Sequence, residues 1–166
     1  MKRIILIASL LVVIFLVLGL LPPIYLTQVE NYTFDKYENL IYKYEVHRYP
    51  AKTIIVNYTG NLTFGISSET NILHFGKVPL VKGVEKIRKM INLYNSNEEP
   101  VKILISFSGN ISKLLSSSKN NFILNSQGNS TVEIALNLNR DDIKIGTYSG
   151  EVRVLIIKPK WGFFLI

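Results

Sequence analysis

Apolar and polar residues alternate one by one along three stretches in the second half of the chain, at 101–107, 132–138 and 152–156. Successive side chains of a β-strand point to opposite faces, so this alternation places one face on a core and the other in water. Residues that favour turns separate the stretches. Shorter candidate strands lie at 40–46, 53–58, 61–67, 72–78 and 121–125. About seven short strands at this spacing predict an all-β, antiparallel β-sandwich.

The segment 84–94 fits two kinds of element. Val84, Ile87, Ile91 and Tyr94 have the spacing of one helical face, with charged residues opposite. A strand would need Ile87, Ile91 and Leu93 to point inward, with Lys89 as an exception on the same face. Periodicity taken alone favours the helix.

Three short sequences resemble a known family. They are LHFGKVP at 73–79, the segment 86–92, and EPV at 99–101, which follows Asn95. They are similar to immunoglobulin-like domains of the ASPM/SPD-2/hydin type, in which an FG-x-V turn precedes a strand ending near Asn and a strand beginning at P-V. The ending GTYSGEVRV at 146–154 is similar to the last hairpin of many extracytoplasmic immunoglobulin-like modules.

The resemblance covers roughly residues 61–158. It implies an immunoglobulin-like sandwich in which 84–94 is a strand. Members of this family are mostly binding and scaffolding modules, so the resemblance implies no catalytic residues, and the fold does not determine the function.

The residues from Ile4 to Leu21 carry no charge and are nearly all Leu, Ile, Val or Phe. At about 1.5 Å per residue the run would span about 27 Å, sufficient for the core of a bilayer. We therefore predict a membrane-spanning helix that includes Ile4, Leu11, Phe15 and Leu21.

This helix would be either a retained signal anchor or a cleaved signal peptide. The run is longer than most cleavable segments and leads into Pro22 and Pro23 without a small-x-small cleavage site, which favours the anchor. Lys2 and Arg3 before it would keep the N-terminus cytoplasmic and place residues from about 24 onward outside the cell membrane. The expected segments are a cytoplasmic tip and anchor at 1–23, a juxtamembrane part at 24–59, the sandwich at 60–158 and a tail at 159–166.

The composition limits the chemistry of the outer part. The chain of 166 residues contains no cysteine, which excludes disulfides and thiolate chemistry. The net charge of the whole chain is +7. Without Lys2 and Arg3, which would lie on the cytoplasmic side, the outer part has a net charge of +5, and its charges are scattered along the sequence. We expect a solvated mixed surface, and no nucleic-acid partner outside the cell.

Five Asn-x-Ser/Thr sequons fit a surface displayed outside the cell. They would carry sugar only in an organism that N-glycosylates, a eukaryote or an archaeon, and we expect an archaeal envelope. The candidate glycosylation sites are Asn31, Asn57, Asn61, Asn110 and Asn129.

Most of the chain's 9 tyrosines lie within 24–59. Tyrosine favours strands and membrane interfaces, because its ring is buried while its hydroxyl stays in water. Whether the strands of this part join the main sandwich or form a separate hairpin stalk is open at the level of sequence.

No pattern of catalytic or metal-binding residues was found. His47 and His74 are far apart in sequence and have no clustered carboxylates beside them, whereas a metal site needs several converging ligands. Asp141 and Asp142 fit an ordinary turn. We expect no enzyme activity, cofactor or metal.

The end of the chain is apolar, with Trp161, Phe163 and Phe164 as its aromatic residues. Six mostly apolar residues are too few to span a membrane. They would form a further strand on their own domain, insert shallowly into the bilayer, or add to the sheet of a partner protein.

These features predict a membrane-anchored, extracytoplasmic module with a structural or protein-interaction role in the cell envelope, as part of a surface-layer, pilus or secretion assembly. The lipid bilayer and an envelope protein are its expected partners. The alternative is a glycan- or ion-binding module, for which the tyrosine-rich region at 32–58 would supply an aromatic platform.

Overall fold

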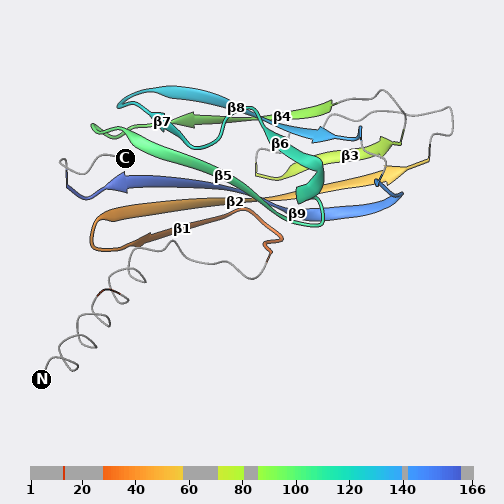
Figure 1. Cartoon of the computed structure of the whole chain (residues 1–166), viewed down its shortest axis with the longest axis horizontal. Helices are drawn as coiled ribbons and strands as arrows, with labels where there is room; N and C mark the ends of the chain where they lie inside the picture. Colours follow the sequence, from red (N-terminus) through yellow and green to blue (C-terminus); the bar gives the residue numbers. More distant parts are fainter. Residues whose placement is uncertain (1–12, 14–27, 58–70, 81–85, 140–141, 162–166) are drawn as a thin grey trace, which may run out of the picture.

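The structure, a computed structural model, describes residues 13, 28–57, 71–80, 86–139 and 142–161. These residues form β-strands and one short 3-10 helix. In chain order the elements are β1 (Thr33–Glu38), β2 (Tyr42–Val56), β3 (Leu73–Pro79), β4 (Lys86–Tyr94), β5 (Val101–Gly109), η1 (Ser112–Leu114), β6 (Leu115–Ser117), β7 (Phe122–Leu124), β8 (Asn129–Asn137) and β9 (Gly146–Pro159). Figure 1 shows them in two layers, with β4 and β8 in one and β1, β2 and β9 in the other.

The larger sheet has six strands. Its order is β1-β2-β9-β5-β7, with β3 also paired to β2, and the smaller sheet has the order β4-β8-β6. All pairings are antiparallel except that of β2 with β3. For the described residues, the prediction of an all-β fold built from antiparallel sheets is therefore confirmed, in an arrangement compatible with a β-sandwich.

Apolar side chains from both sheets form one core. The three alternating stretches of the sequence lie in β5, β8 and β9, and each contributes every second residue to it, as the period of a strand requires. These residues are Val101, Ile103, Ile105, Val132, Ile134, Leu136, Val152 and Val154.

The segment 86–94 is a strand, β4, as the family resemblance implied and against the helical periodicity. It pairs along its whole length with β8, from Lys86 opposite Asn137 to Tyr94 opposite Asn129. Ile87 and Ile91 contribute to the core. A neighbouring strand that supplies a complete hydrogen-bonding ladder outweighs a weak helical pattern in so short a segment.

β2 is one continuous strand, whereas the sequence predicted two, at 40–46 and 53–58. Pro50 lies in the middle of it, although proline cannot donate a hydrogen bond to a neighbouring strand. On one side β2 pairs continuously with β9. On the other side β1 pairs as far as Arg48, and β3 begins to pair at Ala51. Pro50 therefore lies at the gap between two neighbours, where no donor is required.

The strands of the tyrosine-rich part join the main sheet, which decides the question left open by the sequence. β2 pairs with β9 from Tyr42 opposite Pro159 to Ile55 opposite Gly146, and β1 pairs with β2. The start of the tail belongs to the same sheet, because Lys160 N donates to Ile41 O at 2.7 Å.

A buried ion network lies on the face of the larger sheet that points away from the smaller one. It consists of Arg48, Glu151 and Arg153. Arg48 Nη2 lies 2.8 Å from Glu151 Oε2, and Arg153 also donates to the carboxylate of Glu151. Val29 N donates to Glu151 Oε2 at 3.1 Å, so the same carboxylate fastens the segment before β1 to β9.

The residues of the expected membrane helix, Ile4, Leu11, Phe15 and Leu21, lie outside the described residues. Among the residues that are described, no helix has the length and apolar character needed to cross a bilayer.

Candidate functional site

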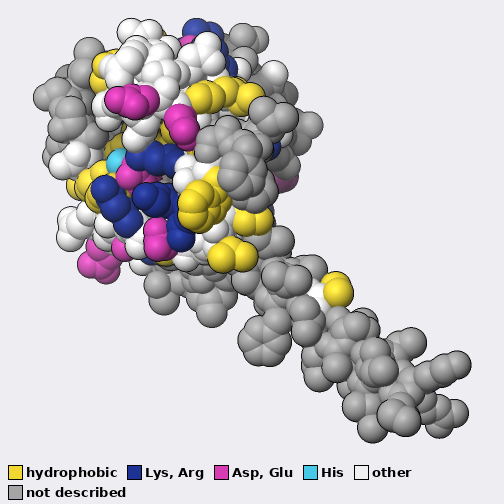
Figure 2. All heavy atoms as spheres, turned by 90° about the vertical axis from the view of Figure 1, so that its left-hand side faces the viewer, with side chains coloured by type: hydrophobic (Ala, Val, Ile, Leu, Met, Phe, Trp, Pro, Cys, Tyr) yellow, Lys and Arg dark blue, Asp and Glu magenta, His cyan; other side chains and the backbone are white. Residues whose placement is uncertain are grey.

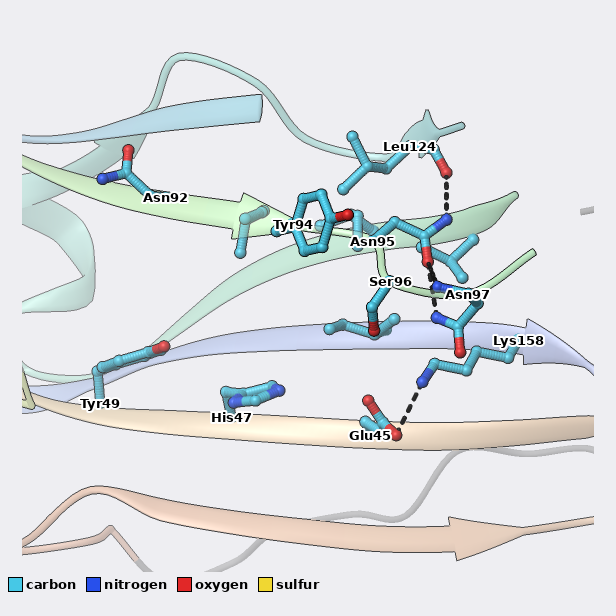
Figure 3. Close-up of a pocket in the computed structure, with 14 residues that line it drawn as sticks. Glu45, His47, Tyr49, Asn92, Tyr94, Asn95, Ser96, Asn97, Leu124 and Lys158 are labelled. Atoms are coloured by element: carbon cyan, nitrogen blue, oxygen red, sulfur yellow. Dashed lines mark hydrogen bonds and ion pairs between the residues drawn. The ribbon is translucent and has the colours of Figure 1, made fainter. Parts of the chain in front are cut away.

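A cavity of about 220 Å³, here called the cleft, lies between the two sheets at the end of the sandwich where β2 begins and β4 ends. Figure 3 shows that β2 carries Glu45, His47 and Tyr49 on one side of it, while Tyr94 and the residues that follow β4 lie on the other side. Side chains from β5, β7 and β9 complete its wall.

β2 directs three polar side chains into the cleft because of its register with β9. Tyr49 is opposite Val152, His47 is opposite Val154 and Glu45 is opposite Ile156. Directly opposed residues point to the same face of a sheet, so the three share a face with core residues of β9. Within the part of the chain that the structure describes, the smaller sheet has three strands, and this part of the inner face of β2 borders a cavity instead of a fully packed core.

Aromatic rings form a continuous row on this face of β1 and β2. The ring centroid of Tyr32 lies 5.1 Å from that of Tyr49 and 6.1 Å from that of His47. Phe34 lies 4.6 Å from His47 by the same measure. These distances are typical of favourable aromatic pairs, so each ring limits the motion of the next.

Glu45 is held by two lysines. Its carboxylate lies 2.8 Å from Lys158 Nζ and 3.3 Å from Lys36 Nζ. Burial alone would raise the pKa of Glu45, but the hydrogen bonds and positive charges of Lys158 and Lys36 lower it below its usual 4.5. The side chain is therefore a carboxylate at neutral pH.

His47 is neutral under the same conditions. Burial is the largest cause that lowers its pKa below 6.5, and the charges of Lys158 and Lys36 act in the same direction, while Glu45 opposes them. The hydroxyl of Tyr32 lies 2.7 Å from His47 Nδ1. Either tautomer of the neutral imidazole can make this hydrogen bond, because a tyrosine hydroxyl both donates and accepts.

The end of the molecule at which the cleft lies is rich in charge. Figure 2 shows Lys and Arg side chains gathered around acidic side chains there. A shallower hollow of about 500 Å³ adjoins the cleft and is lined by Lys36, Lys43 and Lys158 together with Glu38 and Glu45. Lys160 Nζ lies 3.1 Å from Glu38. Of the residues that line the hollow, three lysines against two glutamates give a net charge of +1.

The loop after β4 is held in place by Asn95, which is buried. Its Nδ2 group donates to the carbonyl oxygens of Glu99 at 2.9 Å, Asn125 at 3.0 Å and Leu124 at 3.2 Å. Its Oδ1 atom accepts from Asn97 N at 3.1 Å. One side chain thus fixes the wall of the cleft to β7.

Replacing Asn95 by alanine should lower the free energy of unfolding by about 1–3 kcal/mol, because it leaves buried carbonyl groups without a donor. Urea unfolding followed by circular dichroism would measure the loss. The control is Asn92→Ala, since the side chain of Asn92 is exposed and its oxygen accepts only from Thr131. Equal effects of the two substitutions would contradict the role given to Asn95.

No protein-family model matches the chain, and no curated protein does.

A second cavity, of about 540 Å³, lies elsewhere and is lined by His74, Lys52 and Gln28, among others. His74 of β3 is the pairing partner of Lys52 of β2. Lys52 is five residues along β2 from His47, so the structure does not bring the two histidines together. Among the described residues no group of three or more potential metal ligands occurs. We take the cleft as the candidate site because aromatic rings and groups with shifted pKa values converge there.

Of the predicted glycosylation sites, Asn31, Asn57, Asn110 and Asn129 are exposed, and Asn61 lies outside the described residues. The amide of Asn110 has a structural role, because its Oδ1 atom accepts from Ser149 N at 2.6 Å.

Of the predicted interaction tail, Trp161 is 53% exposed, whereas Phe163 and Phe164 lie outside the described residues. The two lysines before it, Lys158 and Lys160, are each paired with a glutamate of the same sheet.

The sequence missed most of the cleft. The tyrosine-rich region was predicted as an aromatic platform, and two of its residues, Tyr32 and Tyr49, lie at the cleft. For Glu45, Lys36 and Lys158 the sequence predicted only scattered surface charges. The one available signal was the alternation of Glu45, His47 and Tyr49 with Tyr44, Val46 and Arg48, which marks a strand without saying which face meets a cavity.

Proposed function

We propose that the chain is a membrane-anchored, extracytoplasmic module with an immunoglobulin-like sandwich of the ASPM/SPD-2/hydin type. In this proposal it binds another protein of the cell envelope, within a surface-layer, pilus or secretion assembly. The uncharged stretch from Ile4 to Leu21 and the basic residues before it support the anchor and its orientation. The sequons and the absence of catalytic patterns are consistent with this role.

The observation that carries the proposal is the edge of β4. Among the described residues β4 pairs only with β8, so its other edge has no partner strand. Every second residue of an edge strand directs its backbone N–H and C=O groups outward, where an extended segment of another protein can pair with them. Met90, which is 69% exposed, would contact such a segment from the outer face.

The charge of β4 indicates the kind of segment that would bind. Lys86, Arg88 and Lys89 are its only charged residues, and all are basic. Basic residues on an edge strand oppose pairing with a second copy of the same strand. An extended segment with acidic residues would be favoured instead.

Single-cysteine variants test the proposal, because the chain has no cysteine of its own. Met90→Cys and Lys52→Cys place a thiol on β4 and on the exposed side of β2, respectively. We expect a membrane-impermeant maleimide to label both variants in intact cells. With a maleimide that carries a photo-crosslinker, we expect Met90→Cys to give one crosslinked product of defined mass and Lys52→Cys to give none.

The two parts of the proposal fail separately. If both variants are labelled only after lysis, the domain does not lie outside the cell. If both are labelled in intact cells but give the same crosslinked products, or none, the edge of β4 is not the binding surface.

A further inference from the structure

We propose that the cleft binds one pyranose ring of a saccharide and that it prefers an acidic sugar to a neutral one. This site lies beside the edge of β4 and goes beyond the protein interaction proposed above.

The floor of the cleft suits the apolar face of a sugar ring. In a pyranose the C–H groups form an apolar face, which packs on the electron-rich face of an aromatic ring. Figure 3 shows Tyr49 and His47 side by side on β2 with their rings edge-on to the viewer, so that the ring faces are turned toward β4 across the cavity. Tyr32 contacts both rings and holds them in place, which lowers the entropic cost of binding.

The rim of the cleft suits the hydroxyl groups of the same ring. The carboxylate of Glu45 accepts hydrogen bonds, Lys158 Nζ donates them, and Nε2 of the neutral His47 donates or accepts according to the tautomer. The ion pair between Glu45 and Lys158, at 2.8 Å, keeps both groups in fixed positions. A sugar hydroxyl both donates and accepts, so it can bind to either member of such a pair.

The size of the cleft limits the ligand to one ring. Its volume of about 220 Å³ lies below the roughly 300–1,000 Å³ that is typical of pockets for drug-sized molecules. The adjoining hollow of about 500 Å³ shares Glu45, Lys158 and Asn97 with the cleft, so a longer glycan would continue into it.

The charge of the residues that line the hollow sets the preference for an acidic sugar. Among them, Lys36, Lys43 and Lys158 outnumber Glu38 and Glu45. A carboxylate on the ligand would therefore be attracted, and an ammonium group repelled, with a strength that falls as salt is added.

Ligand-observed saturation-transfer NMR on the full-length chain tests this inference. The protein is kept in micelles of dodecylphosphocholine, because detergents with a sugar headgroup would compete. The probes are methyl β-D-glucuronide, methyl β-D-glucoside and methyl β-D-glucosaminide. We expect the glucuronide to bind with a Kd on the order of 1 mM, the glucoside more weakly and the glucosaminide most weakly.

Two variants and a control locate the site. Tyr49→Leu removes the stacking ring and should weaken binding of the glucuronide about tenfold. Tyr49→Phe keeps the ring and should bind the glucuronide as tightly as the wild-type protein does. Tyr42→Leu is the control and should have no effect. The ring centroid of Tyr42 lies 6.2 Å from that of Tyr44, and Tyr42 is not among the residues that line the cleft or the hollow.

Several results would overturn the inference. Absence of saturation transfer to all three probes at 50-fold the expected Kd would exclude a sugar site. Equal binding by Tyr49→Leu and Tyr42→Leu would exclude the cleft as its location. A glucosaminide that binds as tightly as the glucuronide would exclude the proposed role of the lysines.

Discussion

Replacing Glu151 by glutamine should lower the free energy of unfolding by about 3–5 kcal/mol, because breaking a buried ion pair leaves the opposite charge buried without compensation. Glu151 is 0% exposed and Arg48 is 6% exposed. Glutamine has nearly the same shape, so the loss would come from the charge and not from packing. Urea unfolding of the full-length protein in micelles, followed by circular dichroism, would measure it.

The loss should depend on pH. Burial alone would raise the pKa of Glu151, but hydrogen bonds from Arg48 and Arg153, the charge of Arg153 and the N–H of Val29 lower it below 4.5. A group whose pKa is lower in the folded state stabilises the protein above its unfolded pKa and loses this effect as the pH falls through the folded value. The difference between the original protein and Glu151→Gln should therefore be constant above about pH 5 and shrink below it.

A surface ion pair provides the control for this prediction. Glu133 pairs with Arg88 at 3.3 Å, where the side chains are 27% and 56% exposed. Glu133→Gln should cost less than about 1 kcal/mol, since water screens such a pair. Glu45 and His47 also have lowered pKa values, but both residues are present in the wild-type protein and in the variant. Their contributions to the pH dependence therefore cancel in the difference between the two free energies of unfolding. Equal losses from the two substitutions would show that the Glu151 network is not important for stability.

Replacing Gly150 by alanine should destabilise the protein by about 3 kcal/mol or more, the upper end for overpacking. A Cβ atom at Gly150 would lie 2.0 Å from Ser108 O and 2.9 Å from Ile111 Cγ2. The first of these is a backbone atom of β5, which pairs with β9 in the middle of the larger sheet, so it cannot move without disturbing the ladder. In a chain of this size the melting temperature should fall by at least about 6–12 °C.

Gly76→Ala is the matched control. Gly76 has a φ of +76°, but a Cβ atom there would meet no atom within 4 Å. This substitution should cost only the strain of a left-handed backbone, about 1–2 kcal/mol. If Gly150→Ala melts at the same temperature as Gly76→Ala, the approach of β5 to β9 is less close than the structure indicates.

The alternation of apolar residues was enough to find most of the central strands. β5 and β9 contain the predicted stretches in full, and β8 contains all but the last residue of 132–138. The period of two was sufficient because it is a local property of a strand. The prediction was less accurate for β2, which the sequence divided into strands at 40–46 and 53–58, on either side of Pro50. Whether a proline interrupts a strand depends on whether a neighbour needs its N–H, and the neighbours of β2 come from distant parts of the chain.

The candidate site was much less accessible to sequence reasoning. Glu45 and Lys158 are separated by most of the described chain, and they meet only because β2 and β9 pair with one particular register. A shift of that register by one residue would place His47 and Tyr49 on the opposite face. No local pattern records such a register.

The sequence by itself determined the all-β class, the position of most strands and the absence of thiol chemistry, since these follow from the identity and spacing of neighbouring residues. Only the tertiary structure decided that the tyrosine-rich part joins the larger sheet, that Glu151 lies in a buried ion network, and that Glu45, His47 and Tyr49 line a cleft. The physical reason is that local preferences select the type of element, whereas long-range pairing selects its neighbours, and burial and charge depend on the neighbours.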